Sequence, residues 1–166
     1  MSFNPIKAFK TDLGAEERGR KFEKELGFGE GVYCIIARAG NRAYSQLLSA
    51  LWKANEETLK RGQGEDASDA DRDAGNDLAF KLVGIAMSKT ILLGWGGFTG
   101  EDDTTPLEYS TQAAEDLLAL KDFRAKISAI AESHRSFLVK QEAENAKNSA
   151  PTLSGSSIGE ASTISS

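Results

Sequence analysis

The chain contains few of the residues that usually carry catalysis, metal binding or cross-linking. It has one cysteine and one histidine among 166 residues. Cys34 cannot form a disulfide within the chain, and its neighbours Tyr33, Ile35 and Ile36 predict a buried thiol rather than a reactive one. This cysteine usage favours a reducing compartment. The lone histidine, His134, has no nearby residues that would complete a set of metal ligands.

The sequence also lacks an excess of basic charge and a long hydrophobic run. With 25 acidic and 20 basic residues the net charge is −5, which argues against a nucleic-acid-binding surface. The longest apolar stretch, Leu82 to Leu93, is interrupted by polar residues and is too short to span a membrane. Residues 1–5 have no basic region followed by an apolar run, so we expect no signal peptide. We expect a soluble cytosolic protein that binds neither nucleic acid nor membrane.

Patterns typical of enzymes are missing as well. The glycines at 27, 29 and 31, and those at 94, 96, 97 and 100, do not have the spacing of a dinucleotide-binding loop. Asp102 and Asp103 are adjacent carboxylates in a polar loop, where acidic residues usually serve solvation. We therefore expect no enzymatic activity, no cofactor and no metal. An acid–base enzyme centred on these two aspartates is kept as an alternative.

The first part of the chain predicts a flexible arm followed by a β-hairpin. Residues 1–18 have no clear hydrophobic period, and only a local helix around Ala15 to Arg18 is expected there. The glycine-rich segment 27–31 connects two short runs, the second of which is β-branched, and this predicts a hairpin over 20–37. A lone hairpin is marginally stable in water, so it must pack on helices or on another subunit. Its exposed edge could pair between subunits, and we expect a homo-oligomer.

Helical periodicity dominates the rest of the chain. Asn41 and Ser110 are good N-caps, and Asp122 begins the last periodic segment. The pattern predicts helices over about 41–61, 67–93, 110–120 and 122–146. The composition then changes to serine, glycine and threonine, which predicts a disordered tail over 149–166. The expected fold is mainly α: a compact domain over 19–148 with about four helices and the N-terminal hairpin.

Several aromatic residues are candidates for protein interaction. Large aromatics usually serve packing, but tryptophan and tyrosine also dominate the binding energy of many protein interfaces. Both roles can be filled by one side chain. The interaction candidates are Trp95, Phe98, Tyr109, Phe28 and Tyr44.

Four motifs in a fixed order resemble the tail assembly chaperones of long, non-contractile-tailed bacteriophages. Phe28-Gly29 and Val32–Ile36 lead into the segment 38–44. Gly94-Trp95 follows an apolar helix. An acidic loop precedes Pro106–Ser110 and a Leu117-Leu118 pair. Finally, Asp122-Phe123-Arg124 leads to Phe137 and to the segment 142–148, which is rich in Glu, Ala, Lys and Asn. The resemblance covers residues 20–148 and departs from the usual pattern at Gly96-Gly97.

This resemblance implies a non-enzymatic role in virion morphogenesis. Such chaperones bind the tape measure protein, a very long helical chain that sets tail length, and keep it soluble. They help to recruit the major tail protein, which displaces them, so they act late in infection in the host cytoplasm and are absent from the mature virion. The physical requirement agrees, because a long amphipathic helix exposes an apolar stripe that would aggregate.

The resemblance also suggests programmed ribosomal frameshifting, which would give a longer form of the protein as a further partner. Ala146-Lys147-Asn148 can be encoded by GCA-AAA-AAC, which contains a slippery heptamer. Residues 149–166 would then be the ending of the short product.

Other functions are compatible with the same residues. The chain could be a structural or adaptor protein that is retained in a viral particle or complex. It could also be a regulatory protein that binds a host partner through Trp95 and Tyr109.

Overall fold

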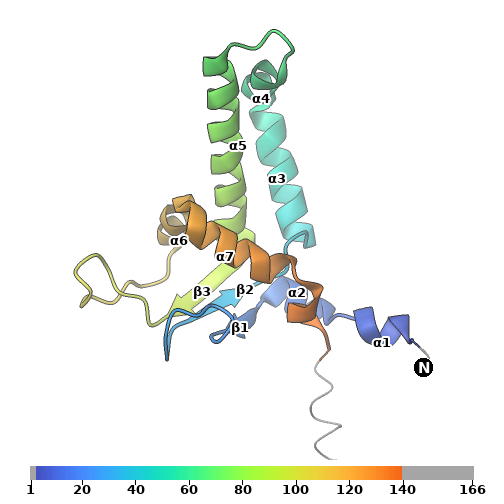
Figure 1. The fold of residues 1–166 in the computed structure, drawn as a ribbon, viewed down its shortest axis with the longest axis vertical. Coiled ribbons are helices and arrows are strands. Elements are labelled where there is room, and N and C mark those ends of the chain that lie inside the picture. The colour runs from blue at the N-terminus through green and yellow to red at the C-terminus, as the bar shows by residue number, and fades with distance from the viewer. Residues whose placement is uncertain (1–2, 140–166) are drawn as a thin grey trace, which may run out of the picture.

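Figure 1 shows the computed structural model of the chain, which describes residues 3–139. The fold is mainly α with a small antiparallel sheet, as predicted. The expected disordered tail lies outside the described residues. In chain order the elements are α1 (Pro5–Phe9), α2 (Leu13–Arg18), β1 (Arg20–Phe22), β2 (Tyr33–Ile36), α3 (Arg42–Ala54), α4 (Glu56–Gln63), α5 (Asp69–Thr90), β3 (Leu92–Gly96), α6 (Thr111–Ala119), α7 (Lys121–Glu132) and the 3-10 helix η1 (His134–Phe137).

The sheet has one strand more than the predicted hairpin. Strands β1 and β2 pair antiparallel, and β3 adds to the other edge of β2. The prediction of a helix over 67–93 was therefore wrong at its C-terminal end, since α5 stops at Thr90. Gly96 lies opposite Tyr33, and a Cβ at Gly96 would lie 2.4 Å from the Tyr33 ring. The glycine at 96 thus permits close strand pairing, whereas the helix ends before any of these glycines is reached.

The segment predicted as one helix over 41–61 forms two, α3 and α4, with a break at Asn55. The Asn55 side-chain amide donates to the carbonyl of Leu51 at 2.8 Å. The backbone N–H of Asn55, which would bond to that carbonyl in a continuous helix, donates to the carbonyl of Trp52. The side chain thereby takes the acceptor that a continuous helix would give to the backbone. Asparagine causes this break without any glycine or proline in the segment.

The last predicted helix, 122–146, ends early in the structure, because α7 stops at Glu132. Ser133 is extended, and the chain then forms η1. This reversal places Phe137 in the core, where its ring lies 5.9 Å from that of Phe22. Burial of a large aromatic explains why the chain leaves the helix. Residues beyond 139 lie outside the described part of the chain.

The predicted flexible arm over 1–18 contains two short helices. Asp12 caps α2 by accepting from the Ala15 N–H at 3.1 Å, and its own N–H donates to Phe137. Ala15 is buried, so α2 belongs to the folded body. Helix α1 extends away from that body (Figure 1).

The molecule consists of a body and a projecting pair of helices. In the body, α6, α7 and the C-terminal part of α5 pack with the sheet around the apolar core. Helices α3 and α4 run beside α5 and stand out from the body (Figure 1). We call this projection the helical hairpin, residues 42–90. In the described part of the chain, none of the helices is both long and apolar enough to cross a membrane.

Arg124 joins the helical hairpin to the body. Its guanidinium donates to the carbonyls of Phe80 (2.6 Å) and Leu118 (2.7 Å) and lies 3.3 Å from the centre of the Phe80 ring. Burial lowers the pKa of the Arg124 side chain. Gly84 makes room for it, because a Cβ there would lie 2.6 Å from the guanidinium. One side chain thus links α5, α6 and α7.

Candidate interaction surfaces

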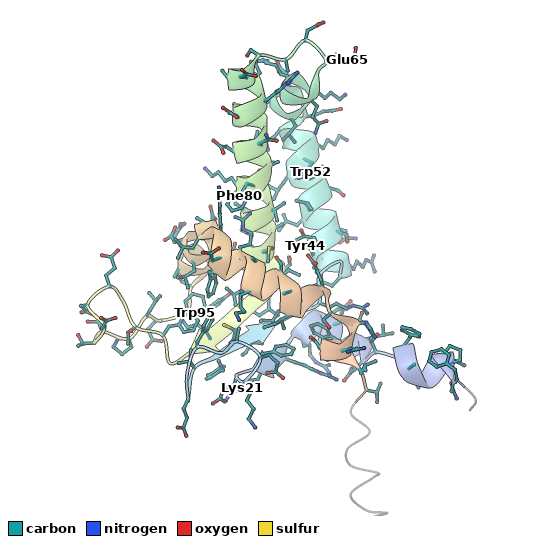
Figure 2. All side chains as sticks on the ribbon, in the orientation of Figure 1. Lys21, Tyr44, Trp52, Glu65, Phe80 and Trp95 are labelled. Carbon is teal, nitrogen blue, oxygen red and sulfur yellow. The ribbon has the colours of Figure 1, made fainter. Side chains whose placement is uncertain are left out.

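Three of the predicted interaction residues form one packed group in the body, around Trp95, which is labelled in Figure 2. The Trp95 ring stacks on the Phe98 ring, with the ring centres 5.3 Å apart. It meets the Tyr109 ring edge-on, with the ring centres 4.9 Å apart. The Trp95 indole donates to the Leu107 carbonyl at 2.7 Å, and the Tyr109 hydroxyl donates to Leu92 at 3.0 Å. Trp95 is only 7% exposed. These contacts give Trp95 and Tyr109 a packing role, in which they hold the 97–108 loop to β3.

The group continues to the surface through Phe28. The Phe28 ring stacks on the Phe123 ring, with the ring centres 6.0 Å apart, and meets the Phe98 ring edge-on, with the centres 6.1 Å apart. Phe28 is nevertheless 40% exposed. We call Phe28, Phe98 and Phe123 the aromatic corner. Phe123 was not among the predicted candidates, although it belongs to one of the four motifs. The structure therefore separates buried aromatics from an exposed edge that a partner could reach.

Acidic residues dominate the chain around Phe98 of the aromatic corner. Residues 90–120 contain no lysine, arginine or histidine. Their six acidic residues are Glu101, Asp102, Asp103, Glu108, Glu115 and Asp116. The corner thus combines exposed aromatic surface with nearby negative charge, which favours a partner that is both apolar and basic.

Within this acidic segment, Asp102 organises its own loop. Its carboxylate accepts from the backbone N–H groups of Thr104 and Thr105 and from the Thr105 hydroxyl. These hydrogen bonds lower the pKa of Asp102 to about 2. The bonds have the pattern of an aspartate-stabilised turn, so the structure assigns Asp102 a local structural part.

Tyr44 does not join the other candidates. It lies in the first turn of α3, where Asn41 caps the helix by accepting from the Tyr44 N–H at 2.8 Å. Burial, and secondarily the nearby charge of Glu132, raise the pKa of the Tyr44 hydroxyl. Tyr44 therefore packs where the helical hairpin meets the body. The predicted frameshift position, Ala146, Lys147 and Asn148, lies outside the described residues.

The helical hairpin carries a cleft that sequence reasoning missed. The cleft has a volume of about 490 Å³, within the range of ligand-binding pockets. It lies where the break at Asn55 changes the direction of the chain. Trp52, which is 46% exposed, lies with Leu59 and Ala79 in its lining. Its polar lining residues are Lys53, Glu56, Lys60 and Gln63.

The apolar face of α3 is less covered than its pattern suggested. Leu47, Leu48 and Leu51 are only partly buried, and α3 contains no fully buried residue. The sequence signal was present, because these leucines recur at helical spacing. What the pattern could not show is that this face packs on a single helix rather than within the core.

The N-terminal arm, residues 3–13, is a second surface that sequence reasoning missed. Four large apolar side chains on it are 59–74% exposed: Phe3, Ile6, Phe9 and Leu13. Ring contacts join Phe3 to Phe9 at 6.3 Å and Phe9 to His134 at 5.4 Å. The recurrence of apolar residues every three positions was the available signal, but the segment is too short for periodicity to be convincing.

Comparison with protein families matches residues 39–148 to the YdaY prophage protein family. The chain belongs to this family. The YdaY match covers the helical hairpin, the acidic loop and both helices that follow it, and the protein is therefore phage-derived. The N-terminal arm and strands β1 and β2 precede the matched residues. Neither the curated proteins nor the solved structures contain a match to this YdaY-family chain.

Proposed function

We propose that this YdaY-family protein is a tail assembly chaperone of a long-tailed phage that binds and solubilises the tape measure protein. The observation that supports this most strongly is the helical hairpin. It stands out from the body and offers an apolar cleft around the half-exposed Trp52. A helical client can lay its apolar stripe against such a surface.

The polar lining of the cleft suits a contact that must be reversible. Lys53, Glu56 and Lys60 place charge beside the apolar centre, and Glu56 and Lys60 form an ion pair. A small apolar centre limits the affinity at any one position, because few side chains are fully desolvated. The net charge of −5 would help to keep a client coated with many copies in solution.

The rest of the proposed role follows from the resemblance. The protein would act in the host cytoplasm, help to recruit the major tail protein, and leave before the virion is complete. A longer frameshifted form would share this work. The phage origin of the family is compatible with each step.

The first experiment measures client solubility. The tape measure protein of the same prophage is co-expressed with the wild-type chain, with Trp52→Glu, and with Ala54→Glu as a control. Ala54 is exposed on the same helix but does not line the cleft. We expect the wild type and Ala54→Glu to keep the client in the supernatant and Trp52→Glu to lose it. A client that precipitates equally with and without the wild-type chain would contradict the proposal.

Two mass measurements address the remaining parts. Expression with an N-terminal tag and the native downstream DNA should give a minor longer product beside the 17.8 kDa chain. Purified virions should lack both forms. Detection of the chain in virions at stoichiometric amounts would instead support the alternative of a structural or adaptor protein.

A further inference from the structure

We propose that the N-terminal arm of one copy docks on the aromatic corner of a second copy. The two surfaces are the exposed apolar face of residues 3–13 and the aromatic corner, where Phe28 is exposed and Phe98 and Phe123 are partly buried. This contact is independent of the cleft proposed for the client, because it uses none of the residues that line the cleft.

The arm is an apolar surface that its own chain leaves uncovered. Ile6 and Phe9 lie three positions apart on α1 and share one face. Phe3 packs its ring edge against Phe9, which extends that face. Hydrogen bonds tie the arm to the body near its base, where Val139 donates to Lys10 and Asp12 donates to Phe137, and Phe9 contacts the His134 ring. Burial of large apolar side chains stabilises association, so this exposed set can support a contact between copies.

The charges of the two surfaces are complementary. The arm, residues 3–13, contains two lysines, and its single acidic residue, Asp12, forms an ion pair with Arg20. The segment that contains Phe98 of the corner, residues 90–120, has six acidic residues and no basic one. Opposite charge guides the encounter and favours this pairing over others. Pairing of two arms would bring like charges together, and the cleft of the helical hairpin is lined by two lysines against one glutamate.

The positions of the two surfaces require a second copy. Figure 1 shows α1 on one side of the body and the 97–108 loop on the opposite side. An arm therefore cannot reach the corner of its own chain. Each docked copy still has a free arm or a free corner, so the contact is heterologous and generates a ring or an open array.

The decisive experiment uses two variants that damage different halves of the contact. Ile6→Asp disables the arm, and Phe28→Lys disables the corner. We expect the wild type to self-associate in sedimentation velocity and each variant alone to need about tenfold higher concentration or more. An equimolar mixture should form a defined heterodimer, because the intact arm of Phe28→Lys docks on the intact corner of Ile6→Asp.

The pattern of outcomes identifies the correct contact. If Phe28→Lys alone still associates like the wild type, the arms pair with each other or bind the cleft, and the proposal is wrong. If the mixture stays monomeric while both variants retain wild-type melting temperatures, the proposal is also wrong. Ala8→Asp is a matched arm control, since Ala8 lies in α1 between the two exposed apolar side chains. Ala8→Asp should weaken association less than Ile6→Asp does.

Discussion

Two tryptophans in this chain have opposite surroundings and should respond differently to truncation. Trp95 is buried, stacked and hydrogen-bonded, whereas Trp52 is half exposed. We expect Trp95→Ala to lower the free energy of unfolding by about 3–5 kcal/mol. Trp52→Ala should change it by about 1 kcal/mol or less, because its surroundings are partly solvent. Chemical denaturation followed by circular dichroism measures both values.

The same pair separates folding from client binding. Trp95→Ala should weaken folding more than it weakens binding of the tape measure protein, and Trp52→Ala should do the reverse. A Trp95→Ala chain that melts like the wild type but no longer binds the client would contradict this assignment.

Cys34 should be inert in the folded protein. It lies in β2 with no exposed surface, as its apolar neighbours predicted, and burial raises the pKa of its thiol to about 12. The thiolate is the reactive form, so at pH 8 both access and ionisation oppose reaction. We expect Ellman's reagent to leave native protein unmodified over minutes and to label one thiol per chain in 6 M guanidinium. Rapid labelling of native protein would mean that β2 opens readily.

At the scale of elements, local patterns succeeded where a signal was confined to one segment. The hairpin of β1 and β2 was predictable because glycines at 27–31 separate two short runs, the second of them β-branched. Asn41 and Ser110 were predictable caps, since each accepts from the backbone N–H three residues on. The mainly α fold class follows from the same periodicity.

The misses occurred where tertiary contacts decided between local alternatives. The apolar run before Gly94 continues the pattern of α5, and periodicity cannot distinguish the end of a buried helix from a buried strand. In the folded protein, pairing with β2 makes the end of this run a strand. The exposure of the arm and of Trp52 was equally invisible, because a pattern shows that a face is apolar but not whether anything covers it.

Helices α4 and α5 pack with their backbones in contact through two glycines. A Cβ at Gly62 would lie 2.7 Å from the Asp71 carbonyl and 3.1 Å from Gly75 Cα. Gly62→Ala should therefore push the helices apart and destabilise the tip of the helical hairpin by about 1–3 kcal/mol. Hydrogen exchange should speed up in α4 and in the first turns of α5 while the body is unchanged.

Gly64→Ala is the matched control for this helix contact. Gly64 has a negative φ, and a Cβ there would meet its nearest atom at an ordinary 3.6 Å. Alanine should be neutral or stabilise by about 0.4–1 kcal/mol, because it restricts the unfolded chain. Equal effects of the two substitutions would show that close packing at Gly62 is unimportant.

The acidic loop should respond to pH through Asp102. Its pKa of about 2 lies below the usual 3.8 because the carboxylate accepts hydrogen bonds in the folded state. The ionised Asp102 carboxylate therefore stabilises the folded loop fully above about pH 4, and this stabilisation is lost as the pH falls towards 2. We expect the amide resonances of Thr104 and Thr105 to shift with a midpoint near pH 2 in NMR titrations. Asp102→Asn should abolish this titration, and a midpoint near 4 would contradict the turn.

At the scale of the whole molecule, the separation of the arm from the aromatic corner governs how copies would assemble. A contact between unlike surfaces leaves one of each unfilled at the ends of every open assembly, so association does not have to stop at a dimer. Each step repeats the same geometry and would present the helical hairpins at regular intervals. A long helical client with a repeated apolar stripe could then engage many weak sites together, and avidity would compensate for the low affinity of each site.

This assembly should grow with protein concentration and shrink with salt. The weight-average mass should rise continuously above 17.8 kDa in sedimentation equilibrium, because each added copy creates a new docking site. Raising the ionic strength from 0.1 to 1 M shortens the Debye length from about 10 to about 3 Å, so it should weaken the contact between the basic arm and the acidic segment. Ile6→Asp should need about tenfold higher concentration or more to associate and serves as the reference. A mass that levels off at twice the monomer mass would instead indicate a symmetric dimer. A weight-average mass that rises with added salt would mean that apolar burial drives association without the charge complementarity that selects this pairing.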